Sequence, residues 1–428
     1  MKRRVVITGL GWVTPLGHDI ETVWRRLLAG ESGVAPTTIF DARTFPSQFS
    51  AEVKGFDLRS VLGASAEEHA AAARNARFAL GAAAMAWRHA GLDRAEPVPE
   101  MVGVYLGGGE GPIDFENFVA AAVAGWDPER GALDAVRWAE VARERLDATR
   151  EIEQDPNAAA GHLAYRFNAR GPNLNTLTAC AASTQAIGEA TEIIRRGDAD
   201  IMIGGGAHSM IHPLGVTGFN RLTALSTRND SYQTASRPFD QTRDGFVLGE
   251  GAGILILEEY EHARGRGADI LAEIIGFGST ADAFRVTDMP EDGRGAIAAI
   301  RAALDDAGVT PADIDYISAH GTGTAENDKI ETRAIREVFG DCAATTPVSS
   351  VKSMLGHLIA GAGAVELITC VLAMRDGMIP PTMNYEHPDP NCDLDYVPNK
   401  ARPAELHICL SNSFGFGGQN DTIVVRKP

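Results

Sequence analysis

The hydrophobic positions of the chain recur with two different periods. Short apolar runs, rich in β-branched residues, predict strands at residues 3–8, 101–106, 174–179, 199–204 and 252–257. Between them, apolar residues at helical spacing predict helices over residues 65–91, 133–150 and 181–196. In the segment 133–150 the apolar residues share one side and the charged residues lie elsewhere, which is typical of an exposed amphipathic helix.

The alternation of strands and helices begins again after residue 260. Strands are predicted at 270–277, 314–319, 406–411 and 421–426, and helices at 294–307 and near 356–374. Strands that alternate with helices indicate an α/β class with mainly parallel sheets covered by helices. We therefore expect two similar halves, residues 1–260 and 261–428, which share one packed body because no low-complexity linker separates them.

Composition and charge exclude several functional classes. The chain has 428 residues and a formal net charge of −18, which argues against nucleic acid and against an anionic membrane surface as partners. The sequence has no apolar run of membrane-spanning length, and the apolar run after Arg4 is too short for a signal peptide. The five cysteines are scattered without a C-x-x-C pair, so we expect a cytoplasmic protein without disulfides or a structural metal.

Cys180 occupies the junction between a predicted strand and a predicted helix. A thiol at a helix N-terminus meets unpaired backbone N–H groups and the positive end of the helix dipole. This environment is expected to lower the thiol pKa and to favour the nucleophilic thiolate. The alternative is a buried, inert cysteine, which is the usual state of a free thiol and the one we expect for the other four cysteines.

Two histidines complete a candidate site. His320 ends the predicted strand 314–319, and His357 precedes a helix of small residues. Functional side chains are expected at the carboxyl ends of strands in α/β proteins. A zinc site made by Cys180 and these histidines is an alternative, although closely spaced ligand pairs are missing. Gly9-x-Gly11 follows a strand, but the third glycine of a dinucleotide-binding fingerprint is absent.

Around these residues the sequence resembles the β-ketoacyl-acyl-carrier-protein synthases, specifically the elongating Cys-His-His class of fatty-acid synthesis and its polyketide relatives. The resemblance spans almost the whole chain. It implies a thiolase-like fold, with two βαβ-type halves in five αβαβα layers, and a homodimer. The motifs that carry it are Val5-Val-Ile-Thr-Gly-Leu-Gly11, Arg237–Gly253, His320-Gly-Thr-Gly-Thr324, Lys352-Ser-x-x-Gly-His357, Pro380-Pro-Thr-x-Asn-Tyr385 and Ser411-Asn-Ser-Phe-Gly-Phe-Gly-Gly418.

The resemblance implies a decarboxylative condensation that extends an acyl chain by two carbons. Cys180 takes the acyl group from a carrier thioester, and His320 and His357 stabilise the enolate that forms when a malonyl thioester loses CO₂. The expected partner is acyl carrier protein, whose phosphopantetheine carries the substrates, and no separate cofactor or metal is expected. The resemblance also implies supporting roles: the N–H groups of Cys180 and Phe416 as oxyanion hole, Lys352 and Glu366 as charge-setting residues, and Thr322, Thr324, Phe246 and Phe414 as substrate-binding residues.

The chain departs from the family pattern at several positions. Glu110 falls where the family has an apolar residue near the acyl pocket, which would favour a short or polar acyl group unless the carboxylate faces solvent. Asp288 falls where a serine is common near the pantetheine phosphate. Acidic residues Glu67 and Glu68 replace part of the usual basic docking segment. We therefore hypothesise that the carrier docks on the helix predicted at 133–150.

Three other functions are alternatives to fatty-acyl elongation. A thiolase shares the fold but uses a second cysteine near the C-terminus, which the closing Gly-Phe-Gly-Gly motif does not provide. A non-catalytic subunit that sets chain length usually lacks the nucleophile, whereas Cys180 is present. A specialised polyketide or polyene ketosynthase remains open, because composition does not separate it from fatty-acid elongation.

Overall fold

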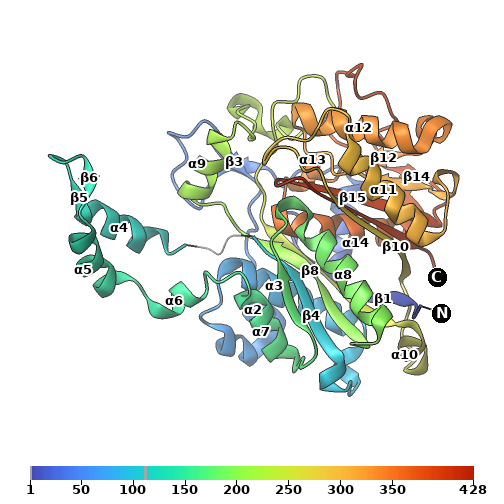
Figure 1. The fold of residues 1–428 in the computed structure, drawn as a ribbon, viewed down its shortest axis with the longest axis horizontal. Coiled ribbons are helices and arrows are strands. Elements are labelled where there is room, and N and C mark those ends of the chain that lie inside the picture. Colours follow the sequence, from blue (N-terminus) through green and yellow to red (C-terminus); the bar gives the residue numbers. More distant parts are fainter. Residues whose placement is uncertain (1, 110–112) are drawn as a thin grey trace.

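The structure, a computed structural model, describes residues 2–109 and 113–428. The first half of the chain contributes five strands to the main sheet, in the order β7-β4-β8-β9-β1. Figure 1 labels β1, β4 and β8 of this half. These strands are β1 (Val5–Val13), β4 (Val102–Gly107), β7 (Asn173–Thr176), β8 (Ile201–His208) and β9 (Gly251–Glu259).

The second half repeats this strand order. Counted along the chain within each half, both sets of strands are arranged 3-2-4-5-1. Antiparallel pairing of β1 with β10 joins them into one ten-stranded sheet. The strands of the second half, in the order β12-β11-β15-β16-β10, are β10 (Ala272–Ala281), β11 (Tyr316–Ser318), β12 (Val348–Ser349), β15 (Ile408–Gly415) and β16 (Gln419–Arg426).

The sheet is mixed, and the expectation of mainly parallel pairing is wrong. β4 pairs in parallel with β7 and β8, and β11 pairs in parallel with β12 and β15. The last strand of each half, β9 or β16, returns antiparallel between its neighbours. The parallel strands nevertheless have their carboxyl ends at one edge, which is where functional side chains are expected.

The helices form three layers that alternate with the two halves of the sheet. α8 (Ala182–Arg196) and α14 (Ala362–Asp376) lie in the middle and contact strands of both halves. All but the last two residues of α14 are buried, which explains why its sequence is apolar on every side. The outer layers contain α3 (Arg74–His89) and α7 (Ala158–Phe167) on one face, and α11 (Arg294–Ala307) and α12 (Ala325–Phe339) on the other.

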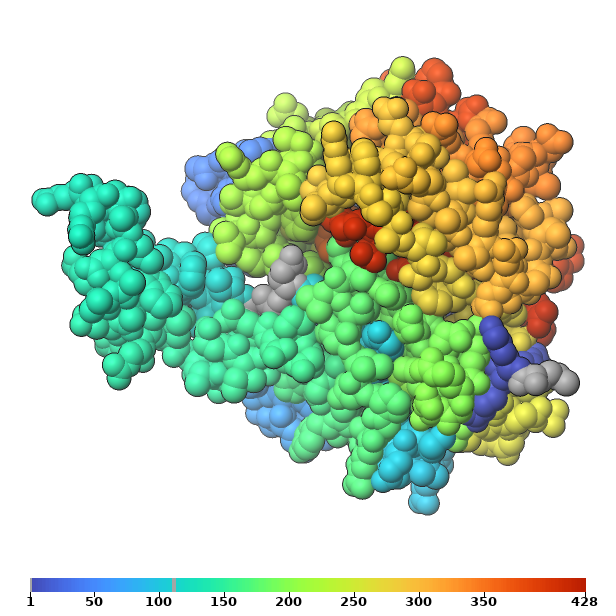
Figure 2. Space-filling model, in the orientation of Figure 1, coloured from blue at the N-terminus to red at the C-terminus, as the bar shows by residue number. Residues whose placement is uncertain are grey.

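An arm projects from this layered body (Figures 1 and 2). The single helix predicted over 133–150 is wrong, because Leu146 has an extended backbone and ends the first helix. Asp147 then begins a new helix by accepting hydrogen bonds from the N–H groups of Thr149 and Arg150. The arm comprises α4 (Phe115–Gly125), β5 (Trp126–Asp127), β6 (Ala132–Leu133), α5 (Ala135–Arg145) and α6 (Ala148–Ile152).

The helix predicted over 65–91 is also shorter than expected. Residues Gly63–His69 form a 3₁₀-helix, and α3 begins only at Arg74. Within residues 2–109 and 113–428, no helix has both the length and the apolar character needed to cross a membrane. The remaining elements are α1 (Ile20–Leu28), α2 (Leu58–Leu62), α9 (Pro213–Arg221), α10 (Tyr260–Gly265), α13 (Lys352–Leu355), β2 (Ala35–Pro36), β3 (Phe49–Ser50), β13 (Met378–Ile379) and β14 (Arg402–Pro403).

Candidate active site

Cys180 lies in a tight turn between β7 and α8. The strand ends at Thr176, a 3₁₀ turn spans Ala179–Ala181, and α8 follows directly. Ala179 has a φ of +47°, in the left-handed region that a residue with a Cβ rarely adopts. Strain of this kind is typical of functional sites, where the surrounding structure holds one side chain in a required direction.

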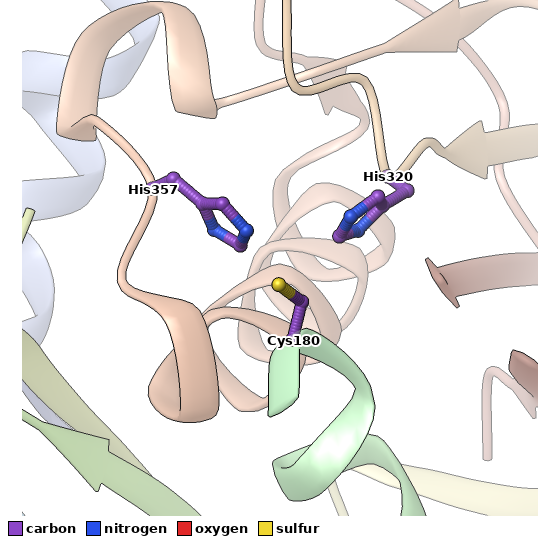
Figure 3. Close-up of side chains that lie close together, drawn as sticks. All are labelled: Cys180, His320 and His357. Atoms are coloured by element: carbon purple, nitrogen blue, oxygen red, sulfur yellow. The ribbon is translucent and has the colours of Figure 1, made fainter. Parts of the chain in front are cut away.

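The two histidines reach Cys180 from the second half of the chain. His320 follows β11, and His357 follows the sharp turn after α13 at Gly356, whose φ is +68°. The Cys180 Sγ and a ring nitrogen of each histidine lie within 4.8 Å of one another. Figure 3 shows the thiol pointing between the two imidazole rings. The structure therefore brings together all three residues that the sequence singled out.

Burial keeps the thiol protonated in the resting site. It raises the pKa of Cys180 to about 12, although the Lys352 charge and the N–H groups of Phe416 and Cys180 oppose this rise. The prediction that the helix N-terminus lowers this pKa is therefore wrong, because desolvation of the thiolate outweighs the favourable contacts. The same two N–H groups favour the thiolate, so they lie near the atom next to which an oxyanion would develop.

Both histidines are neutral. Burial first, and the nearby Lys352 charge second, lower the pKa values of His320 and His357 well below the usual value. Ile359 N donates to Nδ1 of His357 (3.3 Å), and the Lys352 ammonium lies 3.4 Å from Nδ1 of His320. An imidazole whose Nδ1 accepts carries its proton on Nε2, so both rings have an N–H available on the other side.

Lys352 and Glu366 form a buried ion pair behind the histidines. Both side chains are 2% exposed, and the ammonium donates to Oε1 of Glu366 and to the carbonyl oxygen of His320. Burial raises the pKa of Glu366, while Lys352 opposes the rise. The Lys352 charge adds to the effect of burial in favouring neutral imidazoles.

A cavity of about 310 Å³ leads away from the three residues. The hydroxyl groups of Thr322 and Thr324 lie 2.9 Å apart on its wall. Asp288 lies on the wall as well and forms an ion pair with Arg285 (3.1 Å). The predicted substrate-binding residues that line this cavity are Phe246, Thr322, Thr324 and Phe414, together with Phe416. Glu110, the remaining predicted substrate-binding residue, lies outside the described residues.

Sequence reasoning missed Glu331, which holds the loop after His320. Its carboxylate accepts from the backbone N–H groups of His320 (2.8 Å) and Gly321 (2.7 Å). Burial raises the pKa of Glu331 to about 7, and these two hydrogen bonds oppose the rise. One signal could have identified it. Glu331 is a charged residue on the apolar face of α12, beside Ile330, Ala334 and Ile335.

Comparison with known proteins decides the family. A model of the N-terminal domain of beta-ketoacyl synthases matches residues 2–263, and a model of their C-terminal domain matches residues 271–386. The chain belongs to the β-ketoacyl synthase family. The predicted family, the thiolase-like fold and the class of condensing acyltransferase are thereby confirmed.

Relatives of this family match the chain over its full length. The 3-oxoacyl-[acyl-carrier-protein] synthase 2 of Coxiella burnetii is 44% identical, over 100% of this chain and 99% of the relative. The enzyme of the same name from Synechocystis is 42% identical, over 100% of this chain and 98% of the relative. Several solved structures cover 100% of both chains. Two of them are the ishigamide ketosynthase/chain length factor (34% identity, TM-score 0.88) and a β-ketoacyl synthase from Burkholderia phymatum (32%, 0.88).

Proposed function

We propose that this chain is a 3-oxoacyl-acyl-carrier-protein synthase that uses Cys180 as nucleophile and His320 and His357 as enolate-stabilising donors. The observation that carries the proposal is the convergence of one thiol and two neutral imidazoles within 4.8 Å. Neutral imidazoles suit this role, because each can donate an N–H to a developing negative charge without a metal ion.

In the first half-reaction the Cys180 sulfur attacks the carbonyl carbon of an acyl thioester. The tetrahedral oxyanion accepts hydrogen bonds from the N–H groups of Cys180 and Phe416, which favour negative charge on Sγ. The carbon–sulfur bond to the carrier breaks, and the proton of the Cys180 thiol ends on the departing carrier thiol. Removing one oxyanion-hole donor typically costs about 3–4 kcal/mol of transition-state stabilisation.

In the second half-reaction a malonyl thioester enters through the cavity with its pantetheine arm along Thr322 and Thr324. The bond to its carboxylate breaks, CO₂ leaves, and the enolate oxygen accepts from Nε2 of His320 and Nε2 of His357. The enolate carbon then attacks the acyl carbonyl on Cys180. The thiolate departs, regains a proton, and the carrier leaves with a 3-oxoacyl chain two carbons longer.

Intact-mass spectrometry with a panel of acyl-carrier thioesters tests this proposal. A mass increase of one acyl group, lost in Cys180→Ala, is expected for at least one chain length. Absence of an adduct with every donor, in a folded protein, would overturn the assignment of Cys180. The same panel shows the preferred chain length, because the adduct yield ranks the donors directly.

A polyketide-type substrate is a second candidate for the same reaction. A solved structure described as a type II PKS acyl-carrier protein in complex with its ketosynthase bound to the hexaketide covers 100% of this chain, with 35% identity and a TM-score of 0.87. This likeness favours the candidate, whereas the higher identity of the 3-oxoacyl synthases favours fatty-acyl elongation. Turnover of saturated against oxygenated acyl donors separates the two.

A homodimer and a cytoplasmic location complete the proposal. The arm exposes many large apolar side chains, far more than isolated surface residues would require, which supports burial against a second copy. None of the five cysteines, all described, forms a disulfide, which is typical of a reducing compartment. The exposed residues of the arm are Phe118, Val119, Val123, Trp126, Leu133, Val136 and Ile152.

A further inference from the structure

A third buried histidine lies at the carboxyl end of β8. His208 is 1% exposed, and its Nε2 has no hydrogen-bond partner among the described residues. Burial, with a smaller contribution from His212, lowers the pKa of His208 to about 3, so the ring is neutral. Buried polar atoms are almost always paired, and an unpaired one inside a catalytic domain therefore requires an explanation.

The register of β8 on α8 shows where His208 faces. Residues 204, 206 and 208 share one face of the strand. A Cβ on Gly204 would lie 3.7 Å from Ile187, and a Cβ on Gly206 would lie 2.6 Å from Ser183. Two residues along the strand, about 6.6 Å, thus correspond to four residues of the helix, about 6 Å.

His208, the third position on this face, therefore lies opposite the turn that precedes Ser183. That turn is the 3₁₀ segment Ala179–Ala181, which carries Cys180. His208 also contributes, after burial and Lys352, to the lowered pKa of His357, which agrees with a position of the ring near the active site. Gly109 packs against the His208 ring so tightly that a side chain there would overlap it.

His208 does not line the cavity that holds Thr322 and Thr324. The described residues that line the cavity with Thr322 and Thr324 come from other segments of the chain. Three residues after His208, Ile211 packs in the apolar cluster that contains Cys180, Val216 and other large side chains. The imidazole is thus a polar group next to the apolar cluster that contains the nucleophile.

We propose that His208 is a specificity-determining residue that selects acyl chains with an oxygen atom at C3, a proposal that rests on the proposed condensing function. A hydroxyl or keto oxygen near the thioester would pair with Nε2, whereas a saturated chain would leave the imidazole unpaired. Sites that hydrogen-bond a substrate oxygen discriminate strongly against analogues that lack it. The expected preference is on the order of 10- to 100-fold.

Acylation rates of Cys180 with matched donors test this proposal. Hexanoyl, 3-hydroxyhexanoyl and 3-oxohexanoyl thioesters of acyl carrier protein would be compared by time-resolved intact mass. In the wild type at least one oxygenated donor is expected to react at least 10-fold faster than hexanoyl. His208→Leu is expected to bring this ratio close to 1, and His208→Gln is expected to retain most of the preference because the amide still forms a hydrogen bond.

His89→Gln serves as the matched control, because His89 lies on α3 and accepts from Leu10 N (3.2 Å), outside the site. It is expected to leave the ratio unchanged. A ratio of oxygenated to hexanoyl acylation rates near 1 in the wild type would overturn the proposed selectivity of His208, and so would an undiminished preference in His208→Leu. In either case, transfer of hexanoyl to Cys180 would still support the condensing function. If His208→Leu does not fold, the wild-type ratio and the His208→Gln ratio decide the question.

Discussion

The ammonium group of Lys352 donates a hydrogen bond to the backbone carbonyl of His320 (2.6 Å) and lies 3.4 Å from Nδ1 of the same residue. This contact fixes both the position and the charge of the imidazole. A second positive charge on His320 beside the ammonium would be strongly unfavourable in a buried site, so the ring stays neutral and keeps its proton on Nε2. The buried carboxylate of Glu366 compensates the lysine charge.

Removing this ion pair should change the pH dependence of catalysis. In the double variant Lys352→Met, Glu366→Gln, the pKa of His320 should rise, because the Lys352 charge that helps to lower it is gone. Malonyl decarboxylation should fall on the order of 10²-fold. Its rate, measured from pH 5 to 8.5, should begin to decline at a higher pH on the acid side than in the wild type.

Lys329→Met on α12 is the control, because it also removes a lysine charge but leaves Lys352 and Glu366 in place. It should leave the profile unchanged. The double variant is preferable to Lys352→Met alone, since breaking a buried pair by removing one partner typically costs about 3–5 kcal/mol of stability. An unchanged pH profile in the folded double variant would contradict the role of Lys352 in setting the charge of His320.

Cys180→Gln should separate the two half-reactions. A carboxamide resembles the acylated cysteine and can place its oxygen near the N–H groups of Cys180 and Phe416, while the histidines remain in place. The variant should release CO₂ from a malonyl thioester and form the acetyl thioester, but it should not condense. Cys180→Ser should form no acyl-enzyme. A glutamine variant that neither condenses nor decarboxylates would contradict the separate roles of the cysteine and the histidines.

Periodicity predicted the regular elements of the core well because each has one strong hydrophobic pattern. The helix expected at 294–307 is α11, with those same bounds, and the helix after Cys180 begins one residue later than expected. The arm was misread for a local reason. Leu146 continues the apolar spacing, and only the capping contacts of Asp147 show that a second helix begins there.

The site residues could be proposed from motifs, but their electrostatics could not. Nothing in the sequence around Cys180 indicates how completely the thiol is desolvated, since that depends on the second half of the chain closing over it. His208 shows no motif at all. Its importance follows only from the register of β8 against α8, which is a property of the folded layers.

Charged substitutions on the arm should disrupt the proposed homodimer. Val123 is 70% exposed on α4 and Val136 is 69% exposed on α5. A carboxylate at both positions would have to be desolvated at an apolar interface, so Val123→Asp with Val136→Asp should shift the mass in analytical ultracentrifugation from two chains to one. Val98→Asp, 59% exposed on the body, is the control. A double variant that stays dimeric would exclude the arm as the interface.

Charge reversal on α5 should weaken carrier binding if the arm is the docking surface. Arg143 and Arg145 are both exposed in the last turn of α5, where an acidic carrier could reach them. Arg143→Glu with Arg145→Glu should raise the KM for carrier-bound substrates about tenfold or more, with little change in kcat. Arg88→Glu is the control, because Arg88 lies on α3, outside the arm. An unchanged carrier affinity in the α5 variant would refute this docking surface.

Asp421 should make the stability of the protein depend on pH. Its side chain on β16 is 1% exposed, and among the described residues neither carboxylate oxygen has a partner at normal hydrogen-bond geometry. Burial raises the pKa of Asp421 to about 7, with Glu189 adding to the rise and Ser279 opposing it. Ionising this carboxyl therefore costs more in the folded state than in the unfolded state, where the pKa is about 3.9.

The sign of the effect follows from this raised pKa. Below about pH 4 the carboxyl is protonated in both states and contributes no penalty. Between about pH 4 and pH 7 the unfolded chain ionises while the folded one does not, so stability falls as pH rises and then levels off. Asp421→Asn removes the charge and should stabilise the fold by about 3–4 kcal/mol at pH 8, with little effect near pH 4. Thermal midpoints at the two pH values, with Asp305→Asn on the exposed side of α11 as control, measure this difference. A stabilisation of equal size at both pH values would mean that the substitution acts through packing rather than through the buried charge.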